Sequence, residues 1–180
     1  DALQWLTDTS LVCPSSCVSV PESPLASYED EGVFKVYVLD VGLLGAMCNL
    51  SARTILDSEA LFSSFKGALA EQLVAQELLA SGQAGNKVDT GNKLHYFMNQ
   101  STRTEIDFIV DGNERVPQPV PIEVKAGTNL RAKSLAAFVK KHLPVLALHT
   151  SLAPFSRDGV IKNVPLYAFG AYFHKEIAGQ

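Results

Sequence analysis

The sequence is poor in cysteine and has no pattern that would link the few cysteines it contains. Cys13, Cys17 and Cys48 are the three cysteines among 180 residues, which is too few and too odd in number for a disulfide framework. Cys13 and Cys17 have the spacing C-x3-C, but no second Cys or His pair follows nearby to complete a zinc site. We therefore expect free thiols in a reducing cytoplasm.

Long apolar runs are missing as well. No run approaches the roughly 20 residues that a bilayer requires, and no basic leader followed by an apolar stretch opens the chain. Twelve Gly and nine Pro exclude fibrous or low-complexity material, while 47% hydrophobic and 19% charged residues suffice for a folded core. These features predict a cytoplasmic globular chain with no membrane partner.

Charge is unevenly distributed around a net value of −4. Residues 1–59 hold nine acids and two bases, whereas residues 124–157 hold six bases and no acid. A nucleic-acid backbone would be repelled by the first stretch and attracted to the second. The predicted contacts are Arg131, Lys133, Lys140 and Lys141. A solvated helix face explains the same charges equally well, so both interpretations remain open.

The first 50 residues have little core of their own. Residues 2–12 predict a short amphipathic helix, and Pro14, Pro21 and Pro24 predict an irregular segment over residues 13–32. A short strand is expected at 34–39, followed by a turn at Asp40 into a helix. We expect residues 1–50 to be the tail of a truncated, winged-helix-like helical module and residues 51–180 to form the main domain.

The order of elements in this second part predicts an α/β domain with a mixed sheet flanked by helices. A helix at 58–81 is apolar nearly all round and should be buried on most sides. Strands are expected at 94–99, 105–110 and 120–125, joined by connections short enough for antiparallel hairpins. A helix at 131–142 and strands at 145–149 and 164–169 complete the order helix–strand–strand–strand–helix–strand.

Three carboxylates and a lysine form the candidate site. Strand alternation places Glu123 and Lys125 on one face, and pairing with the preceding strand brings Asp107 beside Glu123. Two such carboxylates repel each other unless a cation or a proton joins them. Mg²⁺ (or Mn²⁺) is suited to this position because it takes hard oxygen ligands together with water and phosphate. Glu71, among apolar neighbours on the long helix, needs a partner and reaches the pair if that helix crosses the sheet.

Four blocks of sequence, KVYVLDVGLL at 35–44, EQLVAQEL at 71–78, EIDFI at 105–109 and PIEVK at 121–125, resemble a known group of enzymes. The group is the PD-(D/E)xK nuclease superfamily, and the narrower resemblance is to the C-terminal domain found behind bacterial and archaeal AAA+ ATPase modules. The resemblance implies a restriction-endonuclease-like fold and metal binding by Asp107 and Glu123. It also implies that Glu71 is a further metal ligand or orients the site, and that Lys125 positions the attacking water molecule. The proline that the superfamily has before the aspartate is Ile106 here.

The resemblance also implies an attached ATPase module. No Walker A pattern, G-x4-G-K-[S/T], occurs in the sequence, so nucleotide binding would reside in sequence absent from this chain. Two functions follow as hypotheses. One is an Mg²⁺-dependent phosphodiesterase acting on DNA or RNA, and the other is a catalytically silent module that serves recognition or regulation of the ATPase.

Several residues also have a purely structural interpretation. Glu123 and Lys125 can form a surface ion pair worth under about 1 kcal/mol. Glu77 is expected on the helix surface and Glu105 in solvent, with a position near the site as the alternative for Glu105. The four histidines, His95, His142, His149 and His174, show no mutual spacing and are expected to be structural or exposed.

Overall fold

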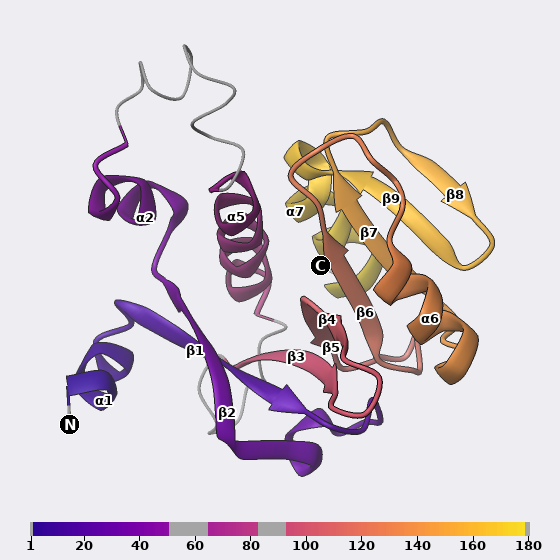
Figure 1. The fold of residues 1–180 in the computed structure, drawn as a ribbon, viewed down its shortest axis with the longest axis horizontal. Helices are drawn as coiled ribbons and strands as arrows, with labels where there is room; N and C mark the ends of the chain where they lie inside the picture. The colour runs from indigo at the N-terminus through magenta and orange to yellow at the C-terminus, as the bar shows by residue number, and fades with distance from the viewer. Residues whose placement is uncertain (1, 51–64, 83–92, 179–180) are drawn as a thin grey trace.

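Two β-sheets and the helices that cover them make up the computed structural model, which describes residues 2–50, 65–82 and 93–178 (Figure 1). The elements, in chain order, are α1 (Ala2–Asp8), β1 (Val12–Val18), η1 (Leu25–Tyr28), β2 (Glu29–Val38), α2 (Val41–Met47), α5 (Lys66–Ala80), β3 (Leu94–Asn99), β4 (Thr104–Ile106), β5 (Phe108–Val110), β6 (Val120–Val124), α6 (Lys133–His142), β7 (Ala147–Ser151), β8 (Ser156–Asp158), β9 (Ile161–Pro165), η2 (Leu166–Ala168), α7 (Phe169–Phe173) and η3 (His174–Ala178).

Both sheets are mixed. The first has the strand order β2-β1-β3-β4, with β1 and β3 parallel and the other pairs antiparallel. The second has the order β5-β6-β7-β9-β8, in which β6, β7 and β9 are parallel to one another and the two outer pairs are antiparallel. The predicted α/β class with a mixed sheet flanked by helices is confirmed, although the strands divide between two sheets rather than one.

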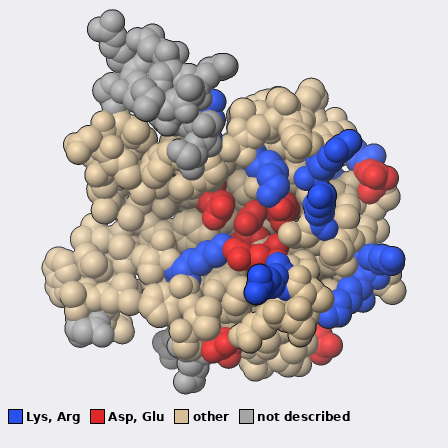
Figure 2. Space-filling model, viewed as in Figure 1, with Lys and Arg blue, Asp and Glu red and all other residues tan. Residues whose placement is uncertain are grey.

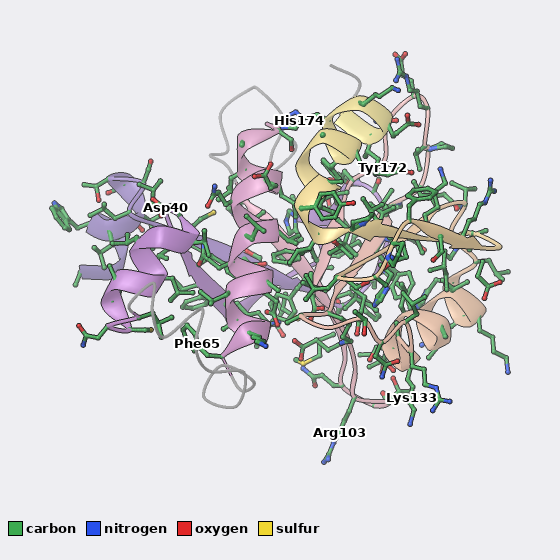
Figure 3. All side chains as sticks on the ribbon, turned by 90° about the horizontal axis from the view of Figure 1, so that it is seen from above. Asp40, Phe65, Arg103, Lys133, Tyr172 and His174 are labelled. Carbon is green, nitrogen blue, oxygen red and sulfur yellow. The ribbon has the colours of Figure 1, made fainter. Side chains whose placement is uncertain are left out.

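Helices cover the two faces of the second sheet. On one face, Val74 and Leu78 of α5 and Phe169 of α7 share a buried core with the strand residues Ile122 and Leu148. On the other face, α6 contributes Leu135 and Phe138 to a second buried cluster. Figure 3, seen from above, shows α6 and α7 on opposite sides of this sheet. Within the described ranges, no helix is both long and apolar enough to cross a membrane.

Most predicted elements are present, with shifted bounds. The strand expected at 94–99 is β3, and the described part of the helix expected at 58–81 is α5, while residues 58–64 lie outside the described ranges. The burial of α5 is narrower than predicted, because Leu69, Leu73 and Leu79 are only half-buried. The strand expected at 105–110 is two strands, β4 and β5. The strand expected at 164–169 begins earlier and ends at Pro165 as β9, and the 3-10 helix η2 follows it.

The irregular segment predicted at 13–32 is wrong. Residues 12–18 form β1 despite Pro14, and β2 already begins at Glu29. Pro14 is tolerated because β1 pairs with β3 only from Ser15 onwards. On the side that faces β3, no strand residue therefore needs the N–H that proline lacks. Residues 1–50 therefore supply a hairpin to the same sheet as β3 and β4, whereas a helical tail was expected. The boundary at residues 50 and 51 adjoins residues outside the described ranges and stays a prediction.

Side chains of α5 attach this hairpin to the rest of the structure. The amide of Gln72 donates from Nε2 to the carbonyl of Val38 at 2.8 Å and accepts from the N–H of Val38 at 3.1 Å. Gln76 accepts a further bond from the N–H of Val41 at 3.1 Å. Gln72 is 2% exposed. Its side-chain amide bonds the N–H and the carbonyl of Val38 on the outer edge of β2, where a neighbouring strand would otherwise bond them.

We expect Gln72→Met, which keeps the side-chain length but removes both hydrogen bonds, to lower the free energy of unfolding by roughly 2–4 kcal/mol. Two main-chain groups of Val38 would then be left without partners beside a buried side chain. Thermal unfolding should show a Tm lower by about 5–10 °C. The matched variant Gln76→Met loses one bond at a half-buried position and should cost less, so equal losses would contradict the role assigned to Gln72.

Candidate acidic site at the junction of the two sheets

Asp107 lies at the point where the chain leaves one sheet and enters the other. Ile106 pairs with Phe97 in the first sheet, and Phe108 pairs with Ile122 in the second. The N–H of Val124 consequently finds no strand partner at this position and donates to Asp107 Oδ2 at 2.7 Å. A carboxylate is well suited here because hydrogen bonds to charged acceptors are stronger than those to neutral ones.

Glu123 and Lys125 share one face of the β6 strand, as the alternation predicts. Lys125 Nζ lies 2.6 Å from Glu123 Oε1, and the Glu123 side chain is 6% exposed, against 42% for Lys125. The ion pair that the sequence offered as a surface feature thus has one partner buried. Within the described part of the chain, Glu123 Oε2 is buried without a hydrogen-bond partner, which is costly for an ionised carboxylate.

Glu71 approaches the same junction from α5. Tyr37 Oη, on β2, donates to Glu71 Oε2 at 3.4 Å, and the charge of Asp107 acts on Glu71. The helix packs against β2 and β3 of the first sheet and against β6 of the second, while a place for Glu71 in a metal site stays a prediction. Glu71, Asp107 and Glu123 are called the acidic cluster below.

Burial raises the pKa of all three carboxyl groups of the acidic cluster. For Glu71 and Glu123 the charge of Asp107 raises the pKa further, while for Asp107 the bond from Val124 and the charge of Lys125 only partly offset burial. The repulsion that the sequence predicted between neighbouring carboxylates is present. No group of three or more His, Cys, Asp or Glu side chains in the described ranges is arranged to hold a metal ion.

Two further residues of the site come from the N-terminal hairpin, where none was predicted. Lys35 Nζ lies 2.5 Å from a carboxylate oxygen of Glu105 and 4.8 Å from the centre of the Tyr96 ring. Its charge partly offsets the rise that burial causes in the pKa of Asp107 and Glu71. Lys35 and Tyr37 alternate along the strand, and this spacing is the signal that places both on the site face. Glu105, expected in solvent, is 44% exposed and also pairs with Lys35 near the site, so the two interpretations both describe it.

Acidic side chains gather near the centre of one face of the molecule, with Lys and Arg side chains around them (Figure 2). The four basic residues predicted to meet nucleic acid, Arg131, Lys133, Lys140 and Lys141, are all exposed on or just before α6. Glu77, expected on the helix surface, is half-buried and packs against α7, since a Cβ at Gly170 would lie 1.9 Å from its Oε2. It takes no part in the acidic cluster.

Residues 66–169 match the model of a family described as a domain of unknown function, DUF4143. The chain belongs to this family. Domains of the DUF4143 family are often found after AAA ATPases. The matched region runs from the start of α5 to the start of α7 and contains the whole acidic cluster and Lys125, but neither Lys35 nor Tyr37. Comparison with curated proteins and with solved structures gave no match.

The raised pKa of Glu71 makes the stability of this DUF4143 chain depend on pH in a defined direction. The folded state binds more protons than the unfolded state between the unfolded and folded pKa values, so stability falls as pH rises through that window. At pH 7 the ionised carboxylate therefore costs stability. We expect Glu71→Gln to raise Tm at pH 7 by about 1–2 °C, a small shift because solvent screens the charge of this half-buried side chain.

The gain from Glu71→Gln should disappear below about pH 4, where the carboxyl is protonated in the unfolded chain as well. Thermal unfolding of both proteins across a pH series measures it. Glu114→Gln removes an exposed carboxylate and serves as the control, with little change expected at any pH. A gain that persisted unchanged at low pH would show that the carboxylate charge is not its cause.

Proposed function

We propose that this DUF4143 chain is an Mg²⁺-dependent phosphodiesterase that acts on DNA or RNA. The observation that carries the proposal is the buried, unpartnered Oε2 of Glu123, next to two further carboxylates whose pKa is raised and one lysine. Perturbed carboxylates gathered at one place are a feature of functional sites. The resemblance of the blocks around these residues to PD-(D/E)xK nucleases, and to domains linked to AAA+ ATPases, supports the same conclusion.

The residues fit a divalent cation in chemistry, although their side chains in the described ranges are not arranged around one point. Asp107, Glu123 and Glu71 would hold it, since all three offer hard oxygen ligands in a region with too little positive charge. When bound, the ion would supply a water of lowered pKa and offset charge on the phosphate. Lys125 already neutralises one oxygen of Glu123, so a cation at Glu123 would approach the unpartnered Oε2.

Lys125 acts as a cation and hydrogen-bond donor in this proposal. Burial by itself lowers its pKa, but the bond and the charge of Glu123 outweigh burial and raise it above the usual value for lysine. The ammonium group therefore keeps its proton at neutral pH and does not abstract one from water. It orients a water molecule or stabilises negative charge that develops on the phosphate.

We expect the purified chain to nick plasmid DNA or cut structured RNA in the presence of Mg²⁺ or Mn²⁺. Lys125→Ala should lower the rate by about 100-fold or more, the usual cost of removing one electrostatic stabiliser. The control is Lys93→Ala, which removes another ion-paired lysine, bound to Glu29 at 3.2 Å, away from the acidic cluster. Cleavage that survives Lys125→Ala would assign the activity to another site or to a contaminant.

Metal binding can be tested without turnover. Titration calorimetry with Mn²⁺ should give a binding heat for the wild type, and Glu123→Gln or Asp107→Asn should weaken the affinity about tenfold or more, because each removes a charged ligand. Glu114→Gln serves as the control for loss of an exposed carboxylate. Bound Mn²⁺ should also raise Tm in proportion to its affinity. No binding heat for the wild type would remove the metal chemistry from the proposal.

A catalytically silent module that serves an attached ATPase is the second candidate. The internal contacts of the site favour it, since Asp107 already accepts a main-chain bond and Glu123 already pairs with Lys125. The nine acids against two bases in residues 1–59 also disfavour binding of a polyanion there. Absence of Mn²⁺ binding together with absence of cleavage would favour this candidate over the enzyme.

A further inference from the structure

A pocket of about 390 Å³ lies between the start of α6 and the strands β7, β8 and β9. His149 and Asn163, both buried, belong to its lining, together with the exposed Arg131 and Lys133. Leu130, Ala132, Ala136, Ile161, Ser156 and Asp158 complete the lining. The pocket therefore combines buried polar groups, an apolar wall and two cations, and its volume falls within the usual range for small-molecule sites.

The pocket lies next to the acidic cluster, because its lining residue His149 is on β7 and Glu123 is on the neighbouring strand β6. In the parallel pair of β6 and β7, Glu123 lies opposite His149, and His149 lies opposite Asn163 of β9. Residues opposite each other on neighbouring strands point to the same face of a sheet. His149 therefore lies beside Glu123 of the acidic cluster, on the same face of the sheet.

The hydrogen bonds of Asn163 fix which nitrogen of His149 carries the proton. Asn163 Nδ2 donates to the carbonyls of Ala153 at 3.2 Å and Pro154 at 2.8 Å, so its Oδ1 is the acceptor that faces His149 Nδ1 at 2.9 Å. Ser151 Oγ donates to the same oxygen at 2.7 Å. His149 Nδ1 is thus the donor, and Nε2 is a buried acceptor without a partner among the described residues.

The opposite side of the pocket suits an anion. Among the residues that the structure describes, no side chain caps the N-terminus of α6, whose N-cap residue is Ala132, so the first N–H groups of this ten-residue helix are available to a ligand. Arg131 and Lys133 flank that end of the helix. Asp158 is the one carboxylate in the lining, which leaves a net positive charge. A ligand that fits has a phosphate at one end and a hydrogen-bond donor at the other.

We infer that this pocket binds one nucleotide of a nucleic-acid strand, next to the phosphodiester at the acidic cluster. The phosphate lies at Arg131, Lys133 and the start of α6. A hydroxyl or amine of the sugar or base donates to His149 Nε2, which is buried in the structure as it stands, once the side chains that cover it move aside. The inference rests on the proposed action on nucleic acid. Of the four basic residues predicted to contact nucleic acid, it assigns phosphate binding to two, Arg131 and Lys133. Lys140 and Lys141, at the far end of α6, lie about 10 Å further along the helix and outside the pocket.

The test measures binding of short single-stranded oligonucleotides to the whole chain by fluorescence anisotropy, in EDTA, so that no metal takes part. Arg131→Gln combined with Lys133→Gln should weaken binding about tenfold and reduce the salt dependence by about one phosphate contact. Lys140→Gln combined with Lys141→Gln removes the same charge from the same helix and should weaken binding less than about threefold. Equal losses for the two pairs would overturn the pocket, because only general attraction would remain.

His149→Phe tests the inner side of the pocket with DNA and RNA oligonucleotides of one sequence. If a ribose hydroxyl is the donor, the wild type prefers RNA and the variant loses that preference. If a base amine is the donor, the variant weakens both by about tenfold. Unchanged affinity for both strands in a folded variant would overturn the role of His149.

The oligonucleotide-binding test and the Mn²⁺-binding test can fail independently of each other. Oligonucleotide binding that depends on Arg131 and Lys133, in a chain that binds no Mn²⁺, would support the pocket and remove the metal-dependent reaction. Mn²⁺ binding without any oligonucleotide binding would overturn the pocket and leave the metal site standing. Oligonucleotides with and without a 5′-phosphate show whether the bound phosphate is terminal or internal.

Discussion

The hydrogen bond from Val124 N–H to Asp107 Oδ2, at 2.7 Å, is the interaction on which the candidate site depends. Because the chain changes sheets at Asp107, the main-chain partner that Val124 would have in a continuous ladder is absent. A buried N–H without an acceptor is costly, so an acidic or amide side chain is required at this break. A carboxylate meets the requirement but brings a charge into the junction, where Glu71 and Glu123 already lie.

The electrostatics of the junction follow from that charge. One buried carboxylate, that of Glu123, two half-buried ones, those of Asp107 and Glu71, and Glu105 face two ammonium groups, those of Lys125 and Lys35. Two negative charges are left without a cation when all groups are ionised. Loss of solvent is the main reason for the raised pKa of Glu71, Asp107 and Glu123, and repulsion from neighbouring carboxylates adds to it. A domain that had only to fold would be more stable with fewer of these acids. An excess of buried negative charge is therefore evidence that some positively charged or proton-donating species belongs at the site.

The sequence predicts what depends on local periodicity and misses what depends on distant pairing. Alternation along one strand was enough to place Glu123 with Lys125, and the apolar neighbours of Glu71 correctly required a charged or polar partner. The parallel pairing of β1 with β3 joins residues some eighty positions apart and leaves no local pattern. Three prolines made the segment that contains β1 look irregular. Without β1, which joins β2 to β3, nothing in the sequence placed Lys35 and Tyr37 of β2 at the site. The break at Asp107 was hidden because Glu105–Val110 alternates like one continuous strand.

The hairpin and the family match together show that the acidic cluster is not electrostatically complete within residues 66–169. That region holds the acids and Lys125, but Lys35 and Tyr37 come from β2. Without the hairpin, β3 would lose its parallel partner and become an exposed edge, which favours aggregation. The core would lose the buried ring of Tyr37, and Asp107 and Glu71 would lose the cation that partly offsets the rise in their pKa. The candidate site therefore draws side chains from the N-terminal hairpin as well, and Gln72 and Gln76 of α5 both accept hydrogen bonds from the main chain at or just after that hairpin.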